Sequence, residues 1–108
     1  MVHIGRTMAE KKEYNAKLVE IGRMLVDKRI ALGKEYKKRE DFIDNRSEEI
    51  FNGEPWISPR HLANVELGKN WISIEKLIVL AYALEEDPVD LFEEIIKIYN
   101  STVFFVDC

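Results

Sequence analysis

Apolar side chains recur every three or four residues along most of this chain, which is the period of an α-helix. The first such row consists of Leu18, Ile21, Leu25 and Leu32, with Arg29 in line with them. Gly33 follows the row and is a typical helix end. The pattern predicts a long helix over residues 10–32, preceded by a flexible N-terminal arm at residues 1–9.

A second helix is predicted to begin near Lys37 or Lys38 and to carry Phe42 and Ile43 toward the core. Its row extends toward Ile50, so the helix is expected to end near residue 51. The sequence Asn52-Gly53-Glu54-Pro55 that follows is a strong turn signal.

A third, short helix is predicted over residues 58–67. Ser58 is a good N-cap because its hydroxyl can accept a hydrogen bond from an unpaired backbone N–H. Leu62 and Val65 are spaced as inward-facing residues, and Gly68 can end the helix in a left-handed conformation. A helix with so few inward residues is suited to presenting its polar face to a partner.

Two further helices complete the pattern. Ser73 is the expected cap of a helix over residues 73–84, whose inward face is predicted to consist of Ile74, Leu77, Ile78 and Ala81. Asp87 and Pro88 are typical of the start of a fifth helix, whose inner row is Leu91, Ile95 and Ile98. We therefore expect an all-α domain of five helices over residues 10–99.

The C-terminal residues 100–108 form a separate tail in this interpretation. Residues 102–106 are β-branched or aromatic throughout, which favours a short strand or another extended segment. Such a strand either pairs with a second copy of the chain or folds back onto its own core.

Composition adds an uneven charge distribution to this outline. The chain has 108 residues, enough for one core, and its 46% apolar content argues against disorder. Its net charge is −4, but residues 1–70 carry 14 Lys and Arg against 12 Asp and Glu, giving +2. Residues 71–108 carry 2 against 8, giving −6. The acidic excess thus lies beyond the third helix, which leaves that helix free to face an anionic partner.

Several classes of protein are not indicated. No apolar run approaches the roughly 20 residues that span a bilayer, so no membrane association is expected. The start of the chain, residues 1–6, lacks the apolar block of a signal peptide, which favours a cytoplasmic location. Cys108 is the only cysteine, and no spacing suggests catalytic or metal chemistry. We expect no enzymatic activity and no cofactor.

Three segments carry a resemblance to a known family. They are Lys28-Arg29-Ile30-Ala31-Leu32-Gly33, the stretch from Ile57-Ser58 to Glu66-Leu67-Gly68-Lys69, and Ile72-Ser73-Ile74-Glu75-Lys76-Leu77. Over residues 16–96 the chain resembles the helix-turn-helix domain of Cro and phage-repressor type regulators, the XRE family. The resemblance implies a five-helix lambda-repressor-like fold, double-stranded DNA as partner, and a dimeric transcriptional regulator, most simply a repressor.

The connection between the second and third helices departs from the family. The segment 39–58 is longer than its counterpart there, so either the second helix is longer or a loop intervenes. The family's usual Ser-Gln-x-x-Leu-Ala is replaced by Lys38-Arg39-Glu40-Asp41-Phe42-Ile43.

The resemblance makes the helix at 58–67 the recognition helix in the DNA major groove. Its base-contacting positions are Pro59, Arg60, His61 and Asn64. Arg60 can donate two hydrogen bonds to guanine and Asn64 can pair with adenine, so these two are the leading readers. Each of these residues could instead be an ordinary surface side chain, and His61 could equally contact a phosphate.

Cations are expected to hold the DNA backbone on either side of this helix. Lys37, Lys38 and Arg39 lie at the predicted start of the second helix, and Lys69 and Asn70 follow the third. The alternative for each is a solvated surface position.

The resemblance also implies a structural ion pair between Arg29 and Glu66, joining the first and third helices. Trp56 and Trp71, which flank the recognition helix, are expected to pack in the core or at a hinge rather than to stack on bases.

Two functions of different class follow. The first is a sequence-specific DNA-binding regulator, a homodimer through the fifth helix and the tail 100–108. The second is a protein-interaction module on the same fold, such as an antitoxin, antirepressor or coactivator, which the acidic C-terminal segment would suit.

Overall fold

A computed structural model describes the backbone of residues 3–107 and the side chains of residues 16–101. The described chain is helical, with no strand. Its elements are α1 (His3–Ala31), the short 3₁₀ helix η1 (Lys34–Tyr36), α2 (Arg39–Ile50), α3 (Pro59–Glu66), α4 (Ile74–Ala83) and α5 (Pro88–Asp107). The all-α class predicted from the sequence is confirmed.

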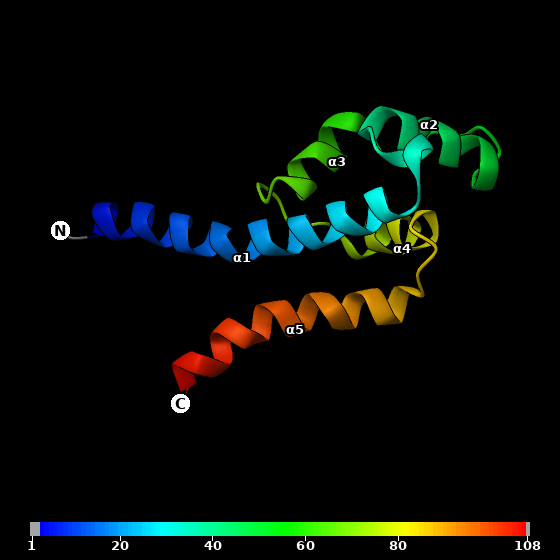
Figure 1. Ribbon diagram of the computed structural model, residues 1–108. Helices are drawn as coiled ribbons and strands as arrows, with labels where there is room; N and C mark the ends of the chain where they lie inside the picture. Colours follow the sequence, from blue (N-terminus) through cyan, green and yellow to red (C-terminus); the bar gives the residue numbers. More distant parts are fainter. Residues whose placement is uncertain (1–2, 108) are drawn as a thin grey trace.

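α1 is the central element of the arrangement. Figure 1 shows α2 and α3 on one side of α1 and α5 on the other, with α4 closing the end of the molecule where the α4–α5 turn lies. The core between these helices is apolar, and its most completely buried large side chains are Leu25, Phe42, Leu62, Leu80 and Leu91. Each of the five α-helices contributes one of them, so a single core holds the fold together.

The predicted helix caps are present. The Ser58 hydroxyl accepts a hydrogen bond from the His61 N–H at 3.0 Å, and the Ser73 hydroxyl accepts one from Lys76 N–H at 3.2 Å. An Asp87 carboxylate oxygen accepts the Val89 N–H at 2.7 Å. These side chains satisfy backbone donors that have no partner within their own helix, which fixes where α3, α4 and α5 begin.

The two ends of the chain differ from the prediction. α1 begins at His3 rather than at residue 10, so it includes most of the segment expected to be an arm. The predicted C-terminal strand is wrong, because α5 continues through residues 100–107. No glycine or proline interrupts the chain after Pro88, and extending an existing helix adds one hydrogen bond per residue. That gain outweighs the β-propensity of residues 102–106.

The inward face of α4 also needs correction. Leu77 and Ala81 are buried as predicted, but the side chains of Ile74 and Ile78 are 59% and 40% exposed. Leu80 takes their place in the core. An apolar side chain on a short helix need not face inward, so apolar spacing alone set the buried face of α4 about one residue away from its real position.

The connection between α2 and α3 contains a non-helical segment, one of the two alternatives that the sequence left open. α2 has 12 residues and is followed by an ordered non-helical segment, residues 51–58. Trp56 anchors this segment, because it is buried, stacks on Phe51 with ring centroids 5.1 Å apart, and donates its indole N–H to the Ile43 carbonyl at 3.0 Å. Lys76 of α4 donates to the Trp56 carbonyl at 2.7 Å. The segment is therefore tied to both α2 and α4.

α1 and α3 cross at very short range through two glycines. A Cβ atom on Gly22 would lie 2.2 Å from the Glu66 carbonyl oxygen, and one on Gly68 would lie 2.6 Å from the backbone of Val19. Gly68 also has a φ of 79°, as expected of a residue that ends a helix in the left-handed region. Glycine is required at this crossing because any side chain would push the two backbones apart.

Candidate nucleic-acid interface

α3 has a buried face and a free face. Leu62, Val65 and Glu66 are buried, whereas Arg60 is exposed and Asn64 lies one turn further along, half-buried. Residues four apart are neighbours on one side of a helix, so Arg60 and Asn64 share the outer face of α3. The sequence prediction that these two residues point away from the core is consistent with this arrangement.

The polar side chains on the outer face of α3 are not bonded to other parts of the protein. Within residues 16–101, the side chains of Arg60, His61 and Asn64 make no hydrogen bond or ion pair. Pro59 occupies the first helical position, where its missing N–H leaves no donor unpaired. These polar groups are thus available to a partner, and Pro59 serves to shape the start of the helix.

Glu66, on the inner face of α3, is held by Arg29 of α1. The Arg29 Nε and Nη2 groups donate to the two carboxylate oxygens at 2.8 and 3.0 Å, and both side chains are buried. Arg29 also donates through Nη1 to the Tyr36 carbonyl at 3.0 Å and to the Lys37 carbonyl. The expected Arg29–Glu66 pair is present, and through Arg29 it joins α1, α3 and the segment that leads into α2.

A second arginine reaches the same carboxylate. The Arg39 Nε group donates to Glu66 Oε1 at 2.6 Å, from a side chain that is 36% exposed. The sequence suggested Arg39 as a phosphate contact and did not foresee this bond. Arg39 therefore bridges the first residue of α2 to the inner face of α3.

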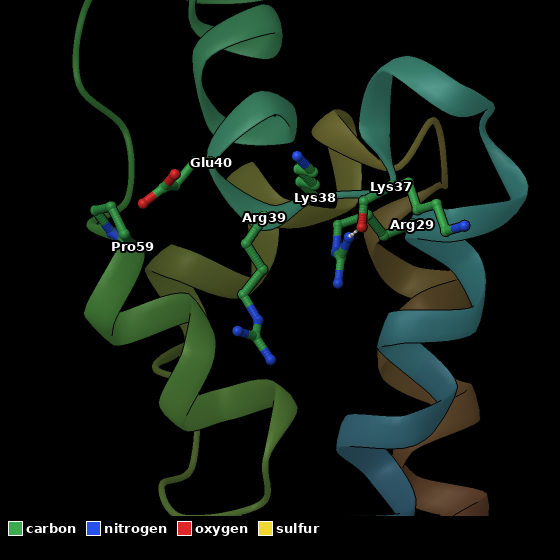
Figure 2. Close-up of a pocket in the computed structure, with 6 residues that line it drawn as sticks. All are labelled: Arg29, Lys37, Lys38, Arg39, Glu40 and Pro59. Carbon is green, nitrogen blue, oxygen red and sulfur yellow. Dashed lines mark hydrogen bonds between the residues drawn. The ribbon is translucent and has the colours of Figure 1, made fainter.

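A positively charged cleft lies between the starts of α2 and α3. It has a volume of about 430 Å³ and is lined by Arg29, Lys37, Lys38, Arg39, Glu40 and Pro59. Figure 2 shows Arg39 extending from the start of α2 into the space between α3 and α1. The Lys37 and Lys38 side chains make no hydrogen bond or ion pair within the described residues. Four cations and one carboxylate, beside the positive end of α2, favour an anion here.

The other end of α3 carries the remaining predicted cation. The Lys69 N–H donates to the Asn64 carbonyl at 2.8 Å, and the Asn70 N–H lies 3.4 Å from the same oxygen. These bonds hold Lys69 and Asn70 just past the end of α3, where both side chains are exposed. Cationic groups thus stand at both ends of the helix that presents Arg60 and Asn64.

The acidic part of the chain lies elsewhere. Its helix α5 runs along the side of α1 opposite α3 (Figure 1). Lys28 of α1 binds two of its carboxylates, Glu94 at 2.8 Å and Glu86 at 3.3 Å. The hydrogen bond to Glu94, assisted by Glu86, raises the pKa of the Lys28 ammonium above its usual value. The carboxylates of α5 therefore lie on the far side of α1 from the outer face of α3.

Sequence reasoning missed a second buried arginine. Arg46 of α2 donates to the Ala83 carbonyl at 2.8 Å, to Glu85 at 2.7 Å and to Glu49 at 2.8 Å, and lies over the Tyr36 ring. Burial alone lowers the pKa of its guanidinium, but the hydrogen bonds to Glu85 and Glu49 outweigh burial and raise it. Arg46 lies four residues after buried Phe42 and three after buried Ile43, a position on the inner face of α2 that could have identified it.

The two tryptophans have different environments. Trp56 is in the core, as predicted. Trp71 is 42% exposed and packs against Tyr99 of α5 with ring centroids 5.8 Å apart, while the Lys17 ammonium lies 4.4 Å from the centre of the Tyr99 ring. Trp71 therefore packs the turn after α3 against α5, and Tyr99 in turn contacts Lys17 of α1.

Comparison of the chain with protein-family models, with curated proteins and with solved structures finds no match.

None of the helices in the described part is long and apolar enough to cross a membrane. The described residues also contain no group of three His, Cys, Asp or Glu side chains that could hold a metal ion.

Proposed function

We propose that this protein is a sequence-specific DNA-binding regulator of the lambda-repressor-like helix-turn-helix type. The observation that carries the proposal is the two-sided character of α3. Its inner face is fixed by Leu62, Val65 and the ion-paired Glu66. On its outer face, the side chains of Arg60 and Asn64 have no partner within the described residues. Arginine and asparagine are the side chains best suited to bidentate contacts with guanine and adenine edges. Pro59 and His61 complete the part of α3 nearest the bases.

The spacing of the flanking cations supports a duplex as the partner. An α-helix with its side chains is about 10–12 Å across, which fits the B-DNA major groove of about 12 Å width, and the eight residues of α3 rise about 12 Å from one end to the other. The cleft with Lys37 and Lys38 lies at one end of this helix and Lys69 with Asn70 at the other. With α3 in the groove, these groups lie near phosphates on its two sides, where they set the register of the protein on the DNA.

The regulator acts in the cytoplasm as a homodimer, with repression by occupancy as its simplest mode of action. One short helix reads too few base pairs for useful specificity, whereas two copies read half-sites about 34 Å apart. α5 offers an apolar row for this contact, since Val89, Phe92 and Ile96 are 72%, 42% and 39% exposed and spaced three and four residues apart. The expected tail, residues 100–108, continues the same helix as far as Asp107.

A protein-interaction module is the second candidate function. The same α5 row is flanked by the exposed acids Asp90 and Glu93, and the C-terminal segment has a charge of −6 over residues 71–108. This combination would suit a basic protein partner. Affinity for duplex DNA distinguishes the two functions, because phosphate contacts make binding fall steeply as salt rises.

Selection of bound duplexes from a random pool tests the leading function and returns the site and its symmetry together. Arg60→Ala should then relax preference at one position per half-site by about 1–3 kcal/mol, measured by titration against single-base variants of the selected duplex. A uniform loss over all duplexes would make Arg60 a phosphate contact. Absence of salt-dependent duplex binding by the unaltered protein would favour the protein-interaction module.

A further inference from the structure

Arg39 occupies a position between the two surfaces that the proposed function requires. Its Nε group is bonded to the buried Glu66 carboxylate at 2.6 Å, on the inner face of α3. Its two Nη groups make no hydrogen bond within the described residues, and its side chain is 36% exposed in the cleft that also contains Lys37 and Lys38. One end of the same guanidinium is thus internal and the other is free.

We propose that Arg39 couples backbone binding to base reading: its Nη groups hold a DNA phosphate in the cleft while its Nε group positions the recognition helix through Glu66. This inference rests on the proposed DNA-binding function. It assigns to Arg39 a positioning role that Lys37 and Lys38, which have no bond to α3, do not share.

The chemistry of the guanidinium permits both contacts at once. Arginine has five N–H donors in a fixed planar fork, so Nε can serve one anion while the Nη groups serve another. Glu66 is buried, with only 2% of its side chain exposed, so a phosphate in the open cleft approaches Arg39 without displacing it from Glu66. A phosphate also adds negative charge beside the Arg29 and Arg39 guanidinium groups, which offsets their mutual repulsion.

The contacts of Glu66 explain why this bond matters for base reading. Glu66 belongs to the same short helix as Arg60 and Asn64, so a shift of Glu66 moves both readers. Arg29 holds Glu66 from α1, and Arg39 holds it from α2. Loss of Arg39 leaves Glu66 held by Arg29 alone, from the α1 side, and the bidentate geometry required at base edges tolerates little rotation of α3.

The test uses the full chain, one selected duplex and one scrambled duplex, with Lys38→Ala as the matched control. Lys38→Ala removes a neighbouring cation that has no bond to α3. The negative slope of log affinity against log salt should therefore become shallower by about one, while the preference for the selected duplex over the scrambled one is unchanged. Arg39→Ala should lower the slope by the same amount and also reduce the preference about tenfold. Arg39→Lys should restore the slope but not the preference, because one ammonium cannot form the fork.

Three results would overturn this role, and they are distinct. If Arg39→Ala matches Lys38→Ala in both quantities, Arg39 is a phosphate contact alone. If Arg39→Ala leaves the salt slope unchanged, it is an internal brace alone. If the unaltered protein binds neither duplex, the proposed function itself fails, together with any coupling built on it. Circular dichroism at the assay temperature confirms that each variant is folded, so a loss of preference reports on α3 rather than on unfolding.

Discussion

Gly22→Ala is the sharpest test of how α3 is held against α1. Replacing glycine by alanine inside a helix ordinarily stabilises a protein by about 1 kcal/mol, because glycine has more backbone freedom to lose. At Gly22, however, the new Cβ would lie 2.2 Å from the Glu66 carbonyl oxygen and 2.8 Å from that of Val65. These are backbone atoms, which no side-chain rotation can move away.

The loss of stability follows from how far α3 must move to relieve the clash. An ordinary contact begins at 3.4 Å, so α3 must move about 1.2 Å away from α1 at this point, from 2.2 to 3.4 Å. Overpacking a well-packed site costs about 1–3 kcal/mol, and rigid backbone places Gly22 at the upper end of that range. The shift also strains the buried pair between Arg29 and Glu66. After the helix-propensity gain, we expect a net loss of about 2 kcal/mol.

Thermal and urea denaturation followed by circular dichroism measure this loss. A destabilisation of about 2 kcal/mol should lower Tm by roughly 8–16 °C in a domain of this size. Arg23→Ala changes the next residue of α1, which is exposed, and should alter stability by no more than about 0.5 kcal/mol. A Gly22→Ala protein with a Tm equal to or above that of the unaltered chain would show that the two helices do not cross at this glycine.

Two further predictions concern the end of the molecule where α2 meets α4. Arg46→Ala should lower the free energy of unfolding by about 2–4 kcal/mol in urea titrations, because the Ala83 carbonyl loses its partner and a cavity remains, and an unchanged value would contradict this role. The hydrogen bond from Tyr36 to Glu49, more than burial, raises the pKa of the Tyr36 phenol above its usual 10.0. The folded state thus keeps this proton more firmly than the unfolded chain. The stability that Tyr36 contributes is therefore fully present below pH 10.0 and is lost as pH rises through the folded-state pKa. Tyr36→Phe should flatten the alkaline decline in stability measured by urea titration at successive pH values, and an equally steep decline would exclude Tyr36 as its source.

Features governed by local rules were predictable from the sequence. Ser58, Ser73 and Asp87 are caps whose partners lie two or three residues away, so their identity and position were enough to place the starts of α3, α4 and α5. Gly68 ends α3 for an equally local reason, its positive φ. Local rules failed for residues 102–106, where the continuing α5 helix outweighs strand propensity.

Features that depend on tertiary contacts were predictable only in part. The pair of Arg29 and Glu66 came from the family resemblance, not from either residue alone. Arg39 also binds Glu66, and nothing near it in the sequence indicates a partner 27 positions away. Gly22 lies inside a helical pattern with no local sign that α3 crosses it. Such residues are recognised only when the path of a distant segment is known.

The position of α3 is set by contacts outside the segment that precedes it, so part of that segment can change in length without moving α3. The crossing at Gly22 and Gly68 fixes the separation of the α1 and α3 backbones, and Arg29 and Arg39 fix the rotation of α3 through Glu66. Residues 52–55, which are exposed and precede the buried Trp56 and Ile57, can then vary in length, because closing a loop twice as long costs only about 0.6 kcal/mol. The hydrogen bond of the Trp56 indole goes to the Ile43 carbonyl of α2, not to α3. A longer α2–α3 connection is therefore compatible with the same presentation of Arg60 and Asn64, provided that Arg29, Arg39, Glu66 and the two glycines are kept.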